Sequence, residues 1–352
     1  MNKLDNPETL LSLDKDNMAI HVASIPYQIE NSLVAAKEIN IPDIYKQVEN
    51  ICFVGMGGSA SAADLLLSGD KENMKKSCSL VRFPELPGWI RGEKSLVVIL
   101  SHSGETEETV AAFKEAAARE TQIIVIAENG RLEEMGEIEG ALVYDYDTTA
   151  TPRASLGYQF GFLVHLANEL GIFEEKIDLG PALELVKNLN EELKPESPTE
   201  NNLAKNLAFR AFDHLPIVLA SGILSAVGRR FKNQFNENGK NFSAFDEMPE
   251  AMHNSIEGTS FPIRAKDDNL YIFLRNSLDK DFVQKRYDLW IEVLAEKKID
   301  YELVEAQGED EWSQKLSLLT LGDWTSFYLA LLNNIDPTPV PTIMECKEKL
   351  KK

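Results

Sequence analysis

Two short segments rich in glycine and hydroxyl side chains each follow an apolar run of the sequence. The first is Met56-Gly57-Gly58-Ser59, and the second, Ser101 to Thr106, reads SHSGET. Glycine lets the backbone approach an anion closely, hydroxyls donate hydrogen bonds, and the helix that follows supplies unpaired N–H groups. The pattern predicts a phosphate cradle that needs no lysine. Its candidate residues are Gly57, Gly58, Ser59, Ser101, Ser103 and Thr106.

Each segment alone also has a purely structural interpretation. Gly-Gly-Ser after a strand is often a tight turn, and Thr106 can cap a helix whose first residues, Glu107 and Glu108, complement the helix dipole. Two such segments on neighbouring strand ends favour an anion site. Dinucleotide and P-loop sites are disfavoured, because the chain lacks the GxGxxG and GxxxxGK[ST] spacings.

Three further residues could act on a bound anion. Arg153 precedes an apolar helical pattern, and its guanidinium either stabilises an anionic intermediate or pairs with a surface acid. Glu237 lies in Asn-Glu-Asn-Gly, which predicts a turn after the helix RRFKNQF, and it is either a presented carboxylate or one of 57 acidic residues in solvent. His253, one of five histidines, is either functional or a core or capping residue.

The segments that position these residues alternate between two patterns. Unbroken Val, Ile and Leu runs predict parallel strands buried on both faces, and segments of period 3.6, such as 107–119, predict helices packed on either side. Ligands of such sheets bind beyond the carboxyl ends of the strands, where both glycine-containing segments are expected. The predicted fold class is α/β, with mainly parallel sheets in three-layer α/β/α domains.

The chain also repeats itself. The segment around Gly57 resembles the segment around Gly222, and three more pairs of elements follow in the same order, which indicates a duplicated domain. These pairs begin at Ser95 and Asn269, at Thr121 and Ile299, and at Leu156 and Leu321.

The repeat suggests where the domains begin and end. We expect an N-terminal domain over 1–170, a linker over 171–202 that contains a helix, and a C-terminal domain over 203–352. Residues 5–49 are expected to be helical and to pack on the first domain.

Composition excludes several classes of protein. The 352 residues can bury two cores without disulfides or metal, and three cysteines without a CxxC motif favour a reducing cytoplasm. The net charge of −21 argues against nucleic-acid and membrane-surface partners. It does not argue against a small anion, because surface charge is screened within about 8–10 Å. No signal peptide or transmembrane segment is expected.

Several motifs together resemble one known family. GMGGSASAADLL, SHSGETEET, TPRASLGYQF, NENGK with PEAMHN, and PTPVPTIMECKEKL resemble the bifunctional phosphoglucose/phosphomannose isomerases of the sugar isomerase (SIS) superfamily, over nearly the whole chain. The resemblance implies tandem SIS domains that interconvert glucose 6-phosphate or mannose 6-phosphate with fructose 6-phosphate. It also implies a homodimer, with a site at or near the interface and no cofactor or metal.

The resemblance also assigns roles. The cradle residues would hold the phosphate, Arg153 would lie near C1 and C2, and Glu237 would be the catalytic base. His253 would open the sugar ring, from its own or the partner subunit, and Lys347 would reach the site from the C-terminal segment. Acceptance of both C2 epimers is linked to a threonine that is either Thr338 or Thr342.

The chemistry independently accounts for these residue types. Aldose–ketose exchange needs one base that takes a proton from C2 and returns it to C1 of a cis-enediolate, which suits Glu237. The guanidinium of Arg153 stabilises the negative charge that develops on oxygen. Ring opening needs a group that exchanges protons near neutral pH, which suits His253.

Three alternatives remain at this point. A single-substrate phosphoglucose isomerase differs from the main hypothesis only in the epimer accepted. A non-catalytic phosphosugar sensor would not need Glu237, His253 or Arg153, and no helix-turn-helix segment is visible. An isomerase domain of a glutamine-dependent aminosugar synthase is disfavoured because no cysteine precedes Cys52.

Overall fold

The chain forms two compact units, each built around a parallel sheet. The computed structural model describes residues 3–69 and 71–350. Unit 1 comprises Met1–Ala23 and Leu179–Lys352, and unit 2 comprises Ser24–Asp178.

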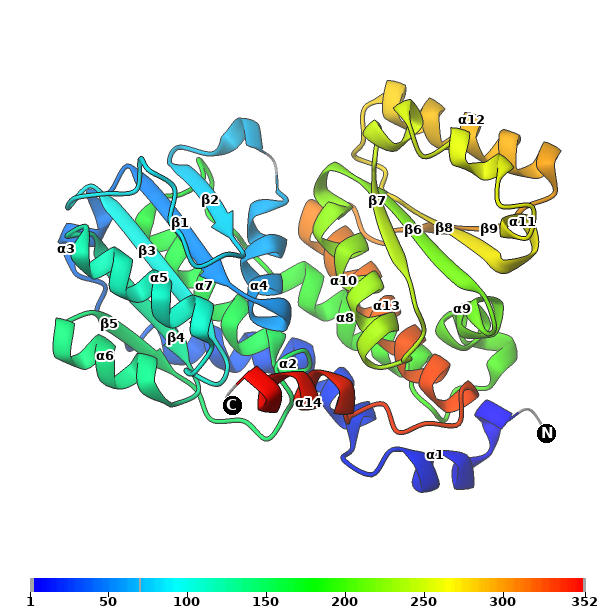
Figure 1. The fold of residues 1–352 in the computed structure, drawn as a ribbon, viewed down its shortest axis with the longest axis horizontal. Helices are drawn as coiled ribbons and strands as arrows, with labels where there is room; N and C mark the ends of the chain where they lie inside the picture. The colour runs from blue at the N-terminus through cyan, green and yellow to red at the C-terminus, as the bar shows by residue number, and fades with distance from the viewer. Residues whose placement is uncertain (1–2, 70, 351–352) are drawn as a thin grey trace. The chain divides into compact units, whose positions relative to one another are not determined.

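Unit 2 has a five-stranded parallel sheet in the order β2-β1-β3-β4-β5 (Figure 1). The strands are β1 (Asn50–Gly55), β2 (Ser77–Val81), β3 (Ser95–Ser101), β4 (Gln122–Ala127) and β5 (Leu142–Asp145). The helices are α2 (Met18–Ala36), which begins in unit 1, α3 (Asp43–Lys46), α4 (Gly57–Leu67), α5 (Glu107–Ala118), α6 (Arg131–Glu139) and α7 (Leu156–Leu170).

The apolar runs of unit 2 form strands covered on both faces. Alternate residues of the central strands, such as Cys52, Val97 and Val125, pack in one core with Phe113 of α5 and Leu132 of α6. The intervening residues of the same strands are also buried, because α4 and α7 pack together on the opposite face. The predicted three-layer α/β arrangement is therefore confirmed.

Unit 1 has a four-stranded parallel sheet in the order β7-β6-β8-β9. Its strands are β6 (Leu215–Ser221), β7 (Ala244–Met248), β8 (Asn269–Arg275) and β9 (Asp300–Glu305). The α-helices that lie wholly in this unit are α1 (Pro7–Leu13), α8 (Gly180–Leu193), α9 (Leu203–Ala211), α10 (Ser225–Glu237), α11 (Ala265–Asp268), α12 (Asp281–Lys297), α13 (Glu311–Leu332) and α14 (Pro341–Leu350). Helix α13 packs against α8, α9 and α10, and α12 covers the other face of the sheet.

The two sheets repeat one topology, as the sequence predicted. In unit 2, β2 pairs with one side of β1, and β3 and β4 follow on the other side. In unit 1, β7 pairs with one side of β6, and β8 and β9 follow on the other side. Gly57 and Gly222 occupy equivalent turns after β1 and β6, with φ angles of 51° and 49°. The edge strands β2 and β7 were not expected, because they are short and only partly apolar.

The N-terminal segment divides between the units, which corrects the expectation that all of 5–49 packs on the first domain. Asp5 accepts a hydrogen bond of 3.0 Å from the Lys205 ammonium, whose side chain is fully buried, and therefore joins unit 1. The helix expected within 171–202 is α8. The domain boundaries drawn from the sequence otherwise remain predictions.

Among the described residues, no helix is long and apolar enough to cross a membrane.

Candidate active site

The two glycine- and hydroxyl-containing segments lie side by side in unit 2, at the carboxyl ends of adjacent strands β1 and β3. The backbone N–H of His102, in the second segment, donates a hydrogen bond of 3.1 Å to Oγ of Ser59, in the first. Within the second segment, Oγ of Ser101 donates to Oγ1 of Thr106 at 3.3 Å, and Ser103 is exposed. The structure thus brings the predicted phosphate-binding hydroxyls together.

The turn at Gly57 leaves open space above the N-terminus of α4. Gly57 is exposed, and a Cβ added there would meet no atom within 4 Å. At the start of α4 the Ser59 N–H already donates to Met56 O at 3.1 Å, so the N–H groups of Gly57 and Gly58 are the ones that can hydrogen-bond an anion in this space.

Arg153 packs against the first segment through its backbone. It is 4% exposed and lies in a turn closed by a hydrogen bond of 2.8 Å from Ala154 N to Thr151 O. A Cβ on Gly58 would lie only 3.1 Å from Arg153 N, so the absence of a side chain at Gly58 permits this approach. Gly58 therefore allows the cation-bearing segment to reach the predicted phosphate cradle.

Glu237 lies in unit 1, as the last residue of α10. The sequence predicted a turn at this position, and that prediction was wrong. The helical hydrogen-bond pattern continues to Asn238, whose N–H donates to Gln234 O at 2.8 Å. Glu237 is half-buried, so its carboxylate is less open to solvent than a loop position would make it.

His253 is also in unit 1, but at the other end of the sheet. It ends a short 3-10 helix, Glu250–His253, that follows β7, and it is exposed. Strand β7 runs parallel to β6, and α10 connects the two along the chain (Figure 1). Glu237 therefore precedes the amino end of β7, and His253 follows its carboxyl end. Within one chain, unit 1 does not bring these two residues together.

The C-terminal candidates lie on or just before α14. Lys347 and Thr342 are exposed residues of this helix, in which no described residue is buried. Thr338 precedes the helix, and its N–H donates to Oδ1 of Asp336 at 2.9 Å.

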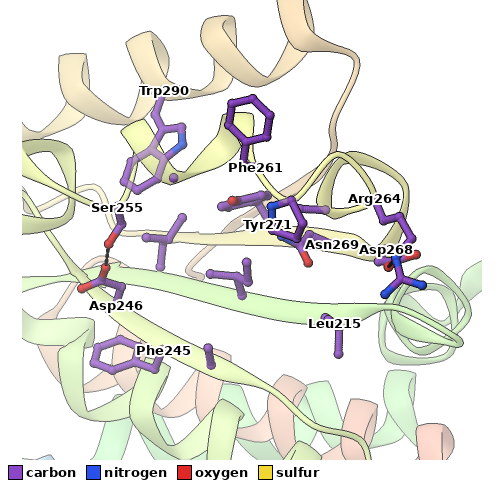
Figure 2. Close-up of a pocket in the computed structure, with 16 residues that line it drawn as sticks. Leu215, Phe245, Asp246, Ser255, Phe261, Arg264, Asp268, Asn269, Tyr271 and Trp290 are labelled. Atoms are coloured by element: carbon purple, nitrogen blue, oxygen red, sulfur yellow. Dashed lines mark hydrogen bonds and ion pairs between the residues drawn. The ribbon is translucent and has the colours of Figure 1, made fainter.

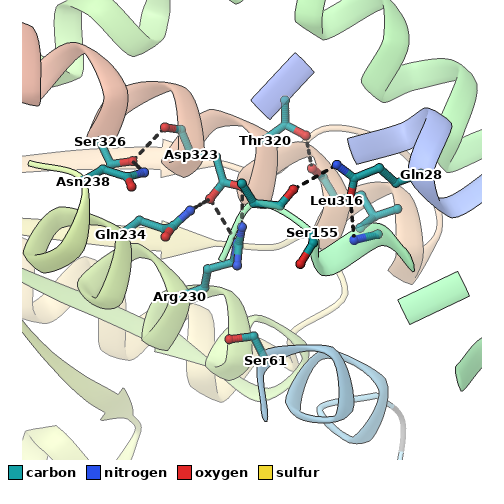
Figure 3. A network of polar contacts seen from close by, with 12 residues as sticks. Gln28, Ser61, Ser155, Arg230, Gln234, Asn238, Leu316, Thr320, Asp323 and Ser326 are labelled. Carbon is teal, nitrogen blue, oxygen red and sulfur yellow. Dashed lines mark hydrogen bonds and ion pairs between the residues drawn. The ribbon is translucent and has the colours of Figure 1, made fainter. Parts of the chain in front are cut away.

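A buried polar network fixes the helix that carries Glu237. Arg230 of α10 donates to both carboxylate oxygens of Asp323 on α13, at 3.0 and 2.6 Å, and Gln234 donates to the same carboxylate at 2.8 Å (Figure 3). Directly after α10, Nδ2 of its C-cap residue Asn238 donates to Oγ of Ser326 at 2.9 Å. Bidentate geometry restricts how α10 can rotate against α13, and this sets the position of Glu237.

The second repeat has lost the open space above its turn glycine. The carboxylate of Asp279 lies there, with Oδ1 3.3 Å from where a Cβ on Gly222 would be. Oγ of Ser221 donates to this carboxylate, and the Tyr287 hydroxyl donates to Ser221 at 3.0 Å. The Asp279 carboxylate thus lies above Gly222, in the position where the first repeat has open space above Gly57.

One cavity of unit 1 contains none of the predicted residues. It has a volume of about 560 Å³ and lies between strands β6, β7 and β8 and the segment that includes Phe261 and Arg264 (Figure 2). Trp290 and Tyr271 line it, and Oγ of Ser255 donates to Asp246 at its edge. Its wall is mostly apolar, unlike the hydroxyl-rich segments of unit 2.

No group of three His, Cys, Asp or Glu side chains in residues 3–69 and 71–350 is arranged to hold a metal ion.

Comparison with known proteins identifies the family. The chain is 32% identical over 331 residues to the bifunctional phosphoglucose/phosphomannose isomerase of Caldicellulosiruptor bescii, with 94% of this chain and 97% of the relative covered. The chain belongs to the bifunctional phosphoglucose/phosphomannose isomerase family. It is therefore an isomerase, and the resemblance seen in its motifs is confirmed.

Further matches agree with membership of the phosphoglucose/phosphomannose isomerase family. The enzyme of the same name from Aquifex aeolicus is 31% identical over 305 residues, which cover 86% of this chain and 91% of the relative. Residues 200–350 match the family described as the bacterial phospho-glucose isomerase C-terminal SIS domain. A hypothetical protein from Thermus thermophilus has a similar fold, with a TM-score of 0.77 at 17% identity, covering 98% of this chain and 92% of that protein.

A polar cluster behind the second segment was not predicted from the sequence. Both ring nitrogens of His102 have partners, Glu128 on one side and Tyr146 and Ser155 on the other. The only sequence signal is the histidine inside SHSGET, since its partners are distant along the chain.

Proposed function

We propose that this protein interconverts glucose 6-phosphate and mannose 6-phosphate with fructose 6-phosphate, through a cis-enediolate. The observation that carries the proposal is the joint placement of the two hydroxyl-bearing segments and Arg153 at one end of the unit 2 sheet. The family of the chain supports the same substrates, because its relatives are named for phosphoglucose and phosphomannose isomerisation.

The phosphate group would bind above Gly57. Its oxygens would accept hydrogen bonds from the N–H groups of Gly57 and Gly58 and from the hydroxyls of Ser59, Ser103 and Thr106. Because these donors are neutral, the site holds a dianion without a lysine. Arg153 supplies the nearby positive charge, and its burial strengthens its interaction with an anion.

Glu237 would transfer the proton. Its carboxylate takes the proton from C2, the C2–H electron pair forms the C1–C2 double bond, and the C1=O π pair moves to O1. The O2 hydroxyl proton then moves to O1, and as the C2=O bond forms, C1 takes back the proton from Glu237. The enediolate carries negative charge on oxygen that the sugar lacks, so Arg153 stabilises the intermediate more than the substrate.

His253 and Lys347 would assist at the ring. Hexose phosphates are mostly closed rings, so a proton must first be exchanged with the ring oxygen, and an imidazole does this near neutral pH. Since Glu237 and His253 are separated by β7 in one chain, we propose that the protein is a homodimer and that His253 acts in the partner's site.

Product analysis tests the proposed reaction. The purified protein, treated with a chelator, is incubated with fructose 6-phosphate, and the hexose phosphates are resolved. Formation of both glucose 6-phosphate and mannose 6-phosphate supports the proposal. Glucose 6-phosphate alone would indicate a single-substrate isomerase, and binding without turnover would indicate a sensor.

Isotope exchange tests the intermediate. When the reaction runs in D₂O, a proton held on Glu237 exchanges with solvent in part of the turnovers, so deuterium enters the carbon-bound positions at C1 and C2. Complete retention of the original hydrogen over many turnovers would contradict the enediolate and indicate a hydride shift.

A further inference from the structure

His102 is held at both ring nitrogens, in the middle of the second hydroxyl-bearing segment. Its side chain is 12% exposed. Nε2 lies 3.2 Å from a carboxylate oxygen of Glu128, which follows β4. Nδ1 lies 3.3 Å from the Tyr146 hydroxyl and 3.3 Å from Oγ of Ser155.

The partners determine where the protons lie. The Glu128 carboxylate can only accept, so the proton of a neutral ring is on Nε2, and Nδ1 is an acceptor. The Tyr146 hydroxyl accepts a hydrogen bond of 2.9 Å from the amide of Gln159 and can donate its own proton to Nδ1. Oγ of Ser155 lies 3.1 Å from Pro152 O and 3.3 Å from Nδ1, and it can donate its one proton to either acceptor. Hydrogen bonds therefore run in one direction, from Gln159 through Tyr146 and His102 to Glu128.

The surroundings favour the neutral ring. Burial lowers the pKa of His102 below its ordinary value, and the Glu128 carboxylate opposes this shift only in part. Burial raises the pKa of Tyr146, so its hydroxyl keeps its proton. The titratable groups that face the ring are these two side chains, from the ends of β4 and β5.

His102 joins two parts of the candidate site, one through its backbone and one through its ring. The backbone N–H of His102 is bonded to Ser59 of the first segment. Its Nδ1 contacts Ser155, two residues beyond Arg153 and in the same hydrogen-bonded turn, which Ser155 N closes on Thr151 O at 3.0 Å. His102 thus links the predicted phosphate-binding segments to the turn that carries Arg153.

We propose that His102 is a positioning residue, whose neutral ring, oriented by Tyr146 and Glu128, fixes the turn of Arg153 relative to the phosphate cradle. This inference rests on the proposed function, because Arg153 acts there on the enediolate. A loosened turn weakens an interaction needed mainly in the transition state. Loss of the ring should therefore lower kcat more than it raises KM.

Kinetics of single variants give the first test. His102→Phe, and Tyr146→Phe, which removes one hydroxyl, should each lower kcat about tenfold while KM changes little. His102→Gln, which keeps a donor and an acceptor, should recover part of kcat. Tyr144→Phe is the matched control, because the Tyr144 hydroxyl bonds Ser32 at 2.8 Å and not His102. Loss of kcat in the control equal to that of Tyr146→Phe would overturn the proposal.

A double-mutant cycle tests whether His102 acts through Arg153. In an Arg153→Lys background, Tyr146→Phe should have almost no further effect on kcat. Full additivity of the two losses would overturn the proposal, since independent effects add.

A spectroscopic measurement separates this inference from the proposed function. ¹⁵N chemical shifts of the His102 ring at neutral pH should show the neutral tautomer protonated at Nε2, with or without inorganic phosphate. An imidazolium, or a ring protonated at Nδ1, would overturn the inference even if the enzyme isomerises sugars. Absence of turnover by the unsubstituted protein would contradict the proposed function instead, and the ring's tautomer would still be measured.

Discussion

Glu237 and His253 lie at opposite ends of strand β7. Glu237 ends α10 before the strand, and His253 ends the short helix after it. The five residues of β7 span about 15 Å, so neither side chain reaches across to the other. This separation is the ground for the proposal that the two groups act from different chains.

Complementation follows from this separation. Glu237→Gln and His253→Ala should each be inactive alone, and mixing them after subunit exchange should restore about a quarter of the unsubstituted activity, because each mixed dimer holds one intact site. Native mass spectrometry verifies that mixed dimers have formed. Mixed dimers without activity would place both groups in one chain's site.

Glu237→Gln should lower kcat by about 10³ while fructose 6-phosphate still binds, because the amide keeps the shape of the side chain but cannot accept the C2 proton. Calorimetry measures binding, and a coupled assay measures kcat. The control is Glu296→Gln, an exposed residue of α12. Full activity of the Glu237 variant would rule out its role as the base.

Gly58→Ala should lower kcat about tenfold, because its Cβ would lie 3.1 Å from Arg153 N and push the turn of Arg153 away from the phosphate cradle. Steady-state kinetics and the melting temperature are measured together. Gly88→Ala is the control, since a Cβ there would meet only the end of the Arg91 side chain, at 3.8 Å. Equal kcat values in the two variants would contradict the close approach.

Asp323→Asn should lower the free energy of unfolding by about 3–5 kcal/mol, because it leaves the buried Arg230 guanidinium without its carboxylate. Chemical denaturation measures the change. The control is Asp288→Asn, which breaks an exposed pair with Arg275 and should cost about 1 kcal/mol or less. Similar losses in both variants would show that the buried pair adds little.

Lys315 should make stability depend on alkaline pH. Burial lowers its pKa from 10.5 to about 8, although Glu311 lies 2.5 Å away and opposes the shift. In the window between these two values the unfolded chain holds more protons than the folded one, so the Lys315 contribution to stability rises with pH, by at most about 1.4 kcal/mol per pH unit. As pH falls through the folded pKa, the contribution is lost.

Denaturation of the unsubstituted protein and of Lys315→Met at several pH values in that window checks this prediction. The difference in unfolding free energy, unsubstituted minus variant, should increase with pH. Lys349→Met is the control, because Lys349 forms an exposed pair with Glu345 at the same helical spacing. A pH-independent difference for Lys315→Met would mean that the lysine keeps an ordinary pKa.

The sequence alone predicted much of the fold. Runs such as Ser95–Ser101 are apolar at nearly every position between their end residues, so burial on both faces and parallel pairing follow from composition. Gly57 and Ser103 could be found as anion-binding candidates because the glycines and hydroxyls lie next to each other along the chain. Edge strand β7 could not be found, since its partly exposed, acidic sequence lacks the apolar signal.

Only the tertiary structure decided how distant residues meet. The contact of Gly58 with Arg153, the carboxylate of Asp279 above Gly222, and the partners of His102 join segments far apart in sequence. Local patterns determine which elements form, because burial and backbone geometry act residue by residue. The side chains that share a site depend on which strand ends and helix ends the packed sheets bring together, and no local pattern records that.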